Sequence, residues 1–395
     1  MRQVAVTGMG IVCGIGSSVP AFWRALCEGR SAVADATRFG TGGIRSPRVV
    51  EAAPFPEDNI PARLSRVDKM AFYAAREALA DSGLGKLPAD AGVSVGTGVG
   101  GLPESEEAYF DILDHGRLSG HLKKFLNHLP ATTADNLSTL LGLRGPRASV
   151  ANACSSSTAS LGQAWLWIAS GEADLVLAGG ADALTRLTVG GFNTLRVVSQ
   201  DRPRPFDRER DGMVVGEGAA FLVMESLERA LSRRARVLAV VEGYGLSSDA
   251  HHATQPHPEG AGALACMRQC LSVAGVAPEE VDHVNAHGTA TIANDASEAR
   301  AISALLKERA SIVPVVSIKG AVGHCLGAAG ALEAVATVLA IANQEVPPCA
   351  GFRSADSAAG LRVPAERERL EIRHAISLNL AFGGNDAALL FGRPA

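Results

Sequence analysis

The sequence predicts an α/β protein built from two similar halves. Short, β-branched apolar runs alternate with longer helical patterns along the whole chain, as they do in layered α/β domains. Apolar residues make up 47% of the 395 residues and charged residues only 20%, which is enough apolar material for a large core. The order of elements around residue 154 also recurs loosely around residue 324, which suggests an internal duplication.

Helical and strand patterns alternate in the first half, and glycines mark several of their ends. The expected elements are a strand at 4–6, a helix at 20–28, a helix at 69–82, a strand at 92–96, a short strand at 148–150, a helix at 155–169 and a buried strand at 174–180. This alternation predicts a parallel sheet covered by helices.

The charged stretch 225–236 is the expected join between the halves. We therefore expect an N-terminal half of residues 1–235, which carries a reactive cysteine, and a C-terminal half of residues 236–395. A strand at 237–241 would open the second half as the strand at 4–6 opens the first.

The second half also repeats the strand, reactive residue and small-residue helix of the first. A strand at 315–317 comes before His324, and an alanine-rich helix spans 327–343. Two such halves packed together would bring their helix N-termini toward one central site.

Bulk properties exclude several classes of protein. A net charge of −4 argues against a nucleic-acid binder, which usually has a basic face. The N-terminus reads as a strand and turn and not as a signal peptide, and no uninterrupted apolar run reaches the roughly 18 residues of a membrane span. We expect a soluble cytoplasmic protein without a membrane partner, whose seven dispersed cysteines are mostly buried thiols.

Cys154 is the strongest candidate for a reactive residue. It follows a short strand and opens a helix, where unpaired N–H groups and the helix dipole stabilise negative charge. Such a position lowers a thiol pKa, to roughly 3.5–7.5 in known cases. The same amides could hold the oxyanion formed when a thioester is attacked.

Two histidines lie in glycine-containing turns downstream. His287 stands in NAHGT at 285–289, after an apolar segment, and His324 stands in GHCLG at 323–327. Either histidine taken alone could be a structural residue, but polar turns after strands often carry function. Lys319 and Glu333 stand in apolar surroundings, and together they suggest a buried ion pair that supports the site.

Two further patterns have competing interpretations. The segment 96–101 (GTGVGG) satisfies the glycine motif of dinucleotide-binding folds, but the acidic residues that follow it would repel a pyrophosphate. The histidines in 251–257 could hold a metal, yet thiol and carboxylate ligands at fixed spacing are missing there. We therefore expect neither a nucleotide nor a metal.

Taken in order, several segments resemble the β-ketoacyl-acyl carrier protein synthases, the elongating condensing enzymes of the thiolase fold. One cysteine with two histidines matches the elongating branch, and thiolases carry a second cysteine where this chain has Phe382. The resemblance runs nearly end to end. It is carried by VTGMG (6–10), ACSSS (153–157), FDRERDG (206–212), GEGA (216–219), SDAHH (248–252), NAHGT (285–289), KGAVGH (319–324) and FGG (382–384).

The resemblance implies a fold and a reaction. The fold would be thiolase-like, with an α-β-α-β-α layering. Cys154 would take an acyl group from the phosphopantetheine arm of an acyl carrier protein, and no separate cofactor would be needed. His287 and His324, as neutral imidazoles, would stabilise the enolate formed when malonyl-carrier protein loses CO₂. The N–H groups of Cys154 and Phe382 would form the oxyanion hole.

Supporting roles follow from the same resemblance. Lys319 with Glu333 would hold His324, and Asp295 would brace the His287 loop. Thr289 and Thr291 would bind the pantetheine arm.

The resemblance also implies protein partners. The first is an acidic carrier protein, and the second is another subunit, either an identical copy or a chain-length-factor-like protein. Basic residues should dock the carrier protein. The candidates are Arg63, Arg66, Lys69, Lys123 and Lys124.

Several residues depart from the family pattern. Ala381 stands where a glycine is usual before Phe382, and Asn385-Asp386 replaces a common Thr-Asn. Glu104 and Ser105 fall in a region that often lines the acyl pocket at the dimer interface, where polar groups would disfavour a long saturated chain.

These departures leave the pathway open. The product could be a fatty acid or a type II polyketide or polyene, and the chain could be the ketosynthase subunit of a specialised synthase. Two other classes stay as alternatives: a non-catalytic partner subunit, and a nucleotide-dependent oxidoreductase that rests only on the glycines at 96–101.

Overall fold

The computed structural model describes residues 1–117, 125–355 and 360–394. One ten-stranded sheet forms its frame, in the order β11-β10-β14-β15-β9-β1-β8-β6-β4-β5. The strands are β1 (Val4–Cys13), β4 (Gly92–Gly96), β5 (Arg147–Val150), β6 (Leu175–Asp182), β8 (Gly218–Ser226), β9 (Ala239–Ser248), β10 (His283–Asn285), β11 (Val315–Val316), β14 (His374–Asn379) and β15 (Asn385–Gly392).

The strand order is the same in both halves of the chain, read outward from the centre. The first half runs β1-β8-β6-β4-β5 and the second runs β9-β15-β14-β10-β11. Each half has parallel pairs on its outer side and antiparallel pairs toward the centre. The halves meet where β1 pairs with β9, Val4 opposite Val241. The predicted duplication is thus present in the topology.

The expectation of a parallel sheet was only partly right. The central strands β1, β8, β9 and β15 pair antiparallel. Strands β14 and β15 are joined by residues 380–384, a connection too short for the crossover that a parallel pair needs. Along the chain, the helix α8 (Leu227–Ser232) lies between β8 and β9, within the charged stretch 225–236.

Two helices form the middle layer of the protein. They are α6 (Ser156–Ser170) and α12 (Ala329–Asn343), and nearly every residue of α12 is buried. They pack so closely at Gly330 of α12 that no side chain would fit there, since a Cβ would stand 1.9 Å from Thr158 Oγ1 of α6. The stretch Leu326–Asn343 is long and apolar enough to cross a membrane, but 89% of it is buried inside the molecule, as in a core helix.

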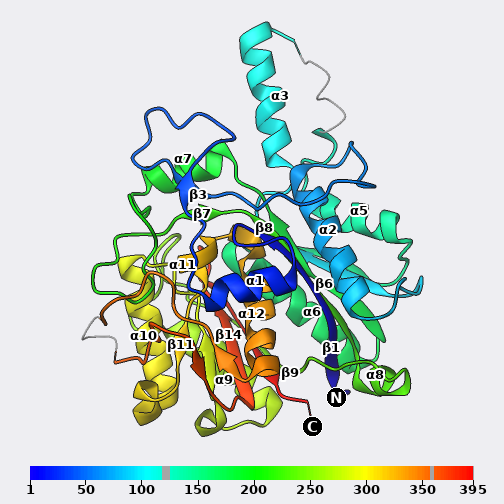
Figure 1. Cartoon of the computed structure of the whole chain (residues 1–395), viewed down its shortest axis with the longest axis vertical. Coiled ribbons are helices and arrows are strands. Elements are labelled where there is room, and N and C mark those ends of the chain that lie inside the picture. Colours follow the sequence, from blue (N-terminus) through cyan, green and yellow to red (C-terminus); the bar gives the residue numbers. More distant parts are fainter. Residues whose placement is uncertain (118–124, 356–359, 395) are drawn as a thin grey trace.

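Outer helices cover the two halves on opposite sides of the body (Figure 1). In the first half they are α2 (Arg66–Asp81) and α5 (Ala131–Leu141), and in the second α9 (Ala261–Ala274) and α10 (Ile292–Leu306). Each half contributes five strands of the sheet and its own outer helices. With the two middle helices between the halves, the order of layers is α-β-α-β-α.

Shorter elements complete the chain, and α3 stands out from the body (Figure 1). The remaining helices are α1 (Val19–Cys27), α3 (Leu102–His115), α7 (Arg186–Thr194) and α11 (Lys319–Val322), with single 3₁₀ turns η1 (Ala153–Ser155), η2 (Pro278–Glu280), η3 (Lys307–Ser311) and η4 (Leu326–Ala328). The remaining strands are β2 (Ala34–Asp35), β3 (Arg48–Val50), β7 (Val215–Gly216), β12 (Glu345–Val346) and β13 (Glu368–Arg369).

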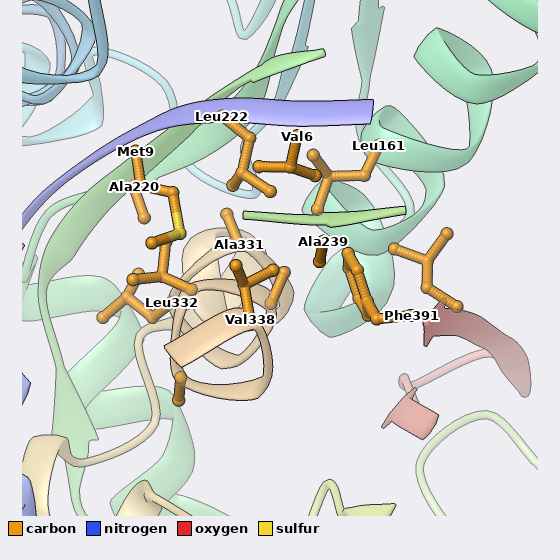
Figure 2. Packing of buried hydrophobic residues seen from close by; sticks show 14 of the residues in the cluster. Val6, Met9, Leu161, Ala220, Leu222, Ala239, Ala331, Leu332, Val338 and Phe391 are labelled. Carbon is orange, nitrogen blue, oxygen red and sulfur yellow. The ribbon is translucent and has the colours of Figure 1, made fainter. Parts of the chain in front are cut away.

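The largest core cluster joins the two halves around α12. Figure 2 shows Ala331, Leu332 and Val338 of this helix packed against side chains of both central strands and of α6. Val6 comes from β1 and Ala239 from β9, and both are fully buried. This shared core fixes the N-terminus of α12 relative to that of α6, and the candidate site lies at these two N-termini.

Candidate active site

Cys154 stands on a sharp turn between β5 and α6. It lies in the 3₁₀ turn η1, and the residue before it, Ala153, has a left-handed backbone with φ of 55°. A non-glycine residue in this region costs energy and is found most often at functional sites. The turn directs the thiol toward the equivalent turn of the second half.

The duplication brings three predicted residues together. The Cys154 Sγ and one ring nitrogen from each of His287 and His324 lie within 4.8 Å of one another. The two imidazole rings meet edge to face, with centroids 5.2 Å apart. Thiol and imidazole are also zinc ligands, so the expectation of a site without metal stays a prediction.

His287 is held in one tautomer by two donors. Its Nδ1 lies 3.1 Å from Lys319 Nζ and 3.2 Å from Asn379 Nδ2. An ammonium and an amide NH₂ group can only donate, so Nδ1 must accept and the ring proton stays on Nε2. His287 can therefore donate a hydrogen bond from Nε2.

Lys319 supports His287 and not His324, so that part of the prediction was wrong. Its Nζ donates to the His287 carbonyl oxygen at 2.6 Å and forms the predicted buried ion pair with Glu333. Asn379 donates to the other oxygen of Glu333 at 2.6 Å. The resemblance assigned Lys319 to His324, five residues further along the chain, but its long side chain reaches the neighbouring strand end, which carries His287.

His324 is positioned through its backbone. Its N–H donates to the Val214 carbonyl at 2.7 Å, and its carbonyl accepts from Gly216 N–H at 2.9 Å. These bonds fix the histidine turn to β7 and the residue before it.

The turn after His287 is fixed by two acids of α10. Asp295 accepts the Ala290 and Phe206 N–H groups, as expected of a residue that braces this loop. Glu298, which the sequence analysis missed, accepts the His287 and Gly288 N–H groups at 2.6 and 2.7 Å. Burial raises the pKa of Glu298 to about 8. Its sequence signal was an acid on the buried face of a helix, one turn beyond Asp295.

Burial sets the charge of the three central groups. It lowers the pKa of His287 and of His324 well below the ordinary value, with the Lys319 charge acting in the same direction, so both imidazoles are neutral. It raises the pKa of Cys154 to about 11, although Lys319 and the Phe382 N–H oppose the rise. The expectation of a lowered thiol pKa was therefore wrong for the free enzyme, because burial outweighs the Lys319 charge and the Phe382 N–H.

The site opens to solvent through a cavity of about 430 Å³. Thr289, Thr291 and Phe382 line it, and Cys154 lies among its walls. The Phe382 N–H lowers the pKa of the Cys154 thiol, which places this N–H group beside the nucleophile. Ala381 also borders the cavity and is not among the residues of positive φ, so the absent glycine causes no backbone strain there.

Comparison with known proteins identifies the fold and the motifs. The sequence model described as "Beta-ketoacyl synthase, N-terminal domain" matches residues 1–230, and that of the "C-terminal domain" matches residues 238–353. The chain belongs to the β-ketoacyl synthase family. Its place among the condensing enzymes agrees with the cysteine and two histidines of the site.

Full-length relatives and a solved structure support this assignment. The chain is 38% identical to nodulation protein E of Rhizobium meliloti strain 1021, and 38% identical to 3-oxoacyl-[acyl-carrier-protein] synthase 2 of Coxiella burnetii. In each case 99% of both chains is covered. A solved structure titled the ishigamide ketosynthase/chain length factor has a TM-score of 0.95 and 34% identity, with 100% of both chains covered.

The backbone amides of the glycine motif at 96–101 bind a carboxylate of the same chain. Asp182 accepts the Gly98 and Val99 N–H groups at 2.7 and 2.9 Å, and the Thr97 hydroxyl at 2.7 Å. It also accepts the Gly327 N–H, just after His324, at 2.6 Å. The amides that would bind a phosphate in a dinucleotide site instead bind a carboxylate, so the oxidoreductase alternative is wrong. Asp182 is a second supporting residue that the sequence analysis missed.

Glu104 and Ser105, which the resemblance places in the acyl pocket at the dimer interface, are buried at the start of α3, and their role in that pocket stays a prediction. Glu104 accepts the Arg66 N–H at 2.7 Å, and Ser105 bonds to the Gly101 carbonyl and to His128 Nδ1. Neither is among the described residues that border the Cys154 cavity. The first turn of α3 packs against the N-terminus of α2, which explains their burial.

Of the predicted docking residues that the structure describes, two are paired with acids of the same chain. Arg66 is turned inward and pairs with the buried Glu217, so its guanidinium is engaged within the chain. Lys69 pairs with Glu57 at 2.5 Å, and Arg63 is exposed. Lys123 and Lys124 lie outside the described residues.

Proposed function

We propose that the chain is an acyltransferase that condenses a Cys154-bound acyl group with a malonyl group carried on acyl carrier protein. One observation carries this proposal: a thiol and two neutral imidazoles lie within 4.8 Å of one another in the wall of one cavity. A thiol is the nucleophile for a thioester, and two neutral N–H donors suit a developing enolate. A non-catalytic partner subunit would not need this arrangement.

The first step loads the enzyme. The Cys154 sulfur attacks the acyl thioester carbonyl, and the Cys154 and Phe382 N–H groups hold the oxyanion. The bond to the pantetheine sulfur then breaks, and the carrier thiol leaves with the proton that Cys154 gives up. Because burial raises the pKa of the free thiol to about 11, proton loss has to accompany the attack.

The second step forms the carbon–carbon bond. The malonyl thioester loses CO₂, and His287 and His324 donate to the enolate oxygen. The enolate carbon attacks the acyl-Cys154 carbonyl, and the Cys154 sulfur leaves and regains a proton. The product is a β-ketoacyl thioester on the carrier protein. Neutral imidazoles suit this step because they bring N–H donors without adding a positive charge beside Lys319.

Replacing His324 with alanine tests the second step. Loss of one oxyanion donor should slow malonyl decarboxylation by about 10²–10³-fold. The measurement is CO₂ release from malonyl-carrier protein. His115→Ala, which removes an exposed histidine at the end of α3, is the matched control and should keep the wild-type rate. A wild-type rate in His324→Ala would refute the role of this residue.

The cavity suits a phosphopantetheine arm. The hydroxyls of Thr289 and Thr291 lie 2.9 Å apart on its wall and can bond to the amides of such an arm. The substrate brings this group with it, so the proposed reaction needs no other cofactor. A cytoplasmic location agrees with a carrier-protein substrate.

A second subunit is part of the proposal. The sheet ends at β5, just before Cys154, and leaves an edge that another strand could extend. The helix α3 projects from the body with large apolar side chains exposed, among them Tyr109 and Leu113. An identical copy or a chain-length-factor-like protein could cover both features. The solved structure titled as a ketosynthase/chain length factor favours the second form, and with it a specialised polyketide or polyene pathway.

The carrier-protein contact is better placed at Arg196 than at Arg66. Arg196 is exposed and borders the Cys154 cavity. Arg196→Glu should raise the KM for carrier-bound substrates by about fivefold, the equivalent of about 1 kcal/mol for a rim charge. The KM for a short pantetheine thioester should not change. Arg63→Glu is the control. If KM rises in Arg63→Glu and not in Arg196→Glu, the carrier protein docks at the residues first predicted.

A further inference from the structure

The ring of His324 is held differently from that of His287. Lys319 and Asn379 place donors beside the Nδ1 atom of His287. The Nδ1 atom of His324 is buried and has no hydrogen-bond partner within the described parts of the chain. The direction of the His324 ring therefore depends on the backbone turn that carries it and on packing, and not on a side-chain donor.

This backbone turn is strained just after the histidine. Leu326 has a left-handed backbone with φ of 51°, which costs energy for a residue with a bulky side chain. Its side chain is buried in a small apolar cluster with Leu184 and Val215. A strained backbone persists only where the surrounding structure holds it. The turn of residues 323–327, called the His324 turn below, therefore needs to be fixed on both sides of Leu326.

A buried carboxylate holds the far end of the His324 turn. Asp182, at the end of β6, is fully buried, and its Oδ2 accepts the Gly327 N–H at 2.6 Å. The same oxygen accepts the Gly98 N–H at 2.7 Å. A hydrogen bond to a carboxylate is stronger than one to a neutral acceptor. The bond to Gly327 also joins the two halves of the chain, because β6 belongs to the first half and the His324 turn to the second.

The other oxygen of Asp182 anchors the carboxylate to the first half. Oδ1 accepts the Thr97 hydroxyl at 2.7 Å and the Val99 N–H at 2.9 Å. Each oxygen thus has two donors, and an ionised carboxylate has acceptor sites for all four. Thr97, Gly98 and Val99 directly follow β4, so the group that binds Gly327 is itself fixed to the end of a sheet strand.

The glycines of the two turns allow this close contact. A Cβ on Gly327 would stand 2.5 Å from the Gly98 nitrogen and 2.7 Å from Asp182 Oδ2. A residue with a side chain at position 327 would therefore push the His324 turn away from the carboxylate. The contact explains why the glycine motif at 96–101 and the GHCLG segment at 323–327 both have a glycine at this point.

We propose that Asp182 is a positioning residue for His324. By accepting the Gly327 N–H, it holds the strained His324 turn in the form that directs the imidazole toward Cys154 and the substrate. The use of His324 in malonyl decarboxylation rests on the function proposed above. Loading of Cys154 does not use His324, so Asp182 acts in the second step of the reaction and not in the first.

Replacing Asp182 with alanine tests this proposal on both steps. Without the carboxylate, the His324 turn can relax and move the imidazole. The kcat of malonyl decarboxylation should fall by about 10²-fold, the scale of a misplacement of about 1 Å. The KM for malonyl-carrier protein should not change, because Thr289 and Thr291 stay in place. Acylation of Cys154 by an acyl thioester should keep the wild-type rate.

Asp182→Asn separates the hydrogen bond from the negative charge. An asparagine can turn its oxygen toward Gly98 and Gly327 and its NH₂ group toward the Thr97 hydroxyl. This variant should decarboxylate within about tenfold of the wild-type rate, because a neutral acceptor makes a weaker bond but still holds the turn. If Asp182→Asn is as slow as Asp182→Ala, acceptance of the Gly327 N–H is not what positions His324.

Gly327→Ala breaks the same bond from the other side and leaves the acid in place. Its added Cβ would displace the His324 turn from Asp182. Decarboxylation should again be lost selectively, with acylation of Cys154 retained. Urea unfolding of each variant shows whether it is folded, and Gly327→Ala carries the test if Asp182→Ala is not.

An acid at the opposite end of β6 provides the matched control. Asp174 precedes this strand and pairs with Arg2 near the surface, and Asp174→Ala should keep both rates. Wild-type decarboxylation in Asp182→Ala or in Gly327→Ala would overturn the proposal. So would an equal loss of acylation and decarboxylation in these two variants, which would indicate a general structural role. If the wild-type enzyme itself releases no CO₂ from malonyl-carrier protein, the proposed function fails, which is a different result from a role of Asp182 that fails alone.

Discussion

Replacing Cys154 with alanine should reduce condensation by at least about 10⁴-fold, the scale of losing a covalent nucleophile. Among the described residues that border the cavity, Cys154 is the only thiol and so the only group that can form a thioester with the acyl chain. Malonyl decarboxylation should remain measurable, because His287 and His324 keep their positions. Product formation and CO₂ release, measured in parallel on carrier-bound substrates, check this expectation.

The control for this variant removes a different thiol. Cys27 lies on α1, near Glu345, and is not among the described residues that border the cavity. Cys27→Ala should condense at the wild-type rate. If Cys154→Ala condenses within tenfold of the wild-type rate, Cys154 is not the nucleophile.

Replacing Lys319 with alanine should have the largest effect on stability. The Lys319–Glu333 pair is almost fully buried, with side-chain exposures of 2% and 1%. Removal of one partner leaves a buried carboxylate uncompensated, which costs about 3–5 kcal/mol. His287 would also lose one of the two donors that fix its tautomer. We expect a lower free energy of unfolding in urea and slower decarboxylation under native conditions.

An exposed ion pair serves as the control for Lys319. Lys69 pairs with Glu57 near the surface, and Lys69→Ala should cost no more than about 1 kcal/mol. If the two alanine variants lose equal stability, burial of the Lys319 pair does not have the energetic role argued here. If Lys319→Ala decarboxylates at the wild-type rate, the ammonium does not set the His287 tautomer.

The sequence could predict the features that rest on local pattern. The strand at 92–96 and the helix that follows Cys154 depend on residues near one another in the chain, and both are present. The duplication was visible because the same order of strand, turn and small-residue helix occurs before α6 and α12. The ordered motifs then predicted that Cys154, His287 and His324 would meet.

Features that depend on distant contacts could not be predicted in this way. Lys319 is five residues from His324 in the chain, but its side chain crosses to His287. Arg66 looked like a surface cation because its acidic partner, Glu217, lies 151 residues away. The Cys154 pKa depends on burial by both halves, which the helix-start argument did not include.

The glycine motif at 96–101 is a second case in which a local pattern did not reveal its distant partner. Its local pattern fits a phosphate-binding turn, and the structure does make its amides bind an anion. That anion is Asp182, from the end of β6, a residue that no rule of spacing connects to the motif.

Peptide mapping of the acyl-enzyme tests the central claim most directly. Wild-type enzyme incubated with acyl-carrier protein, without malonyl substrate, should gain one acyl group. After proteolysis, mass spectrometry should locate this group on the peptide that contains Cys154, among the seven cysteines of the chain. An acyl group on any other residue, or no covalent adduct at all, would contradict the account.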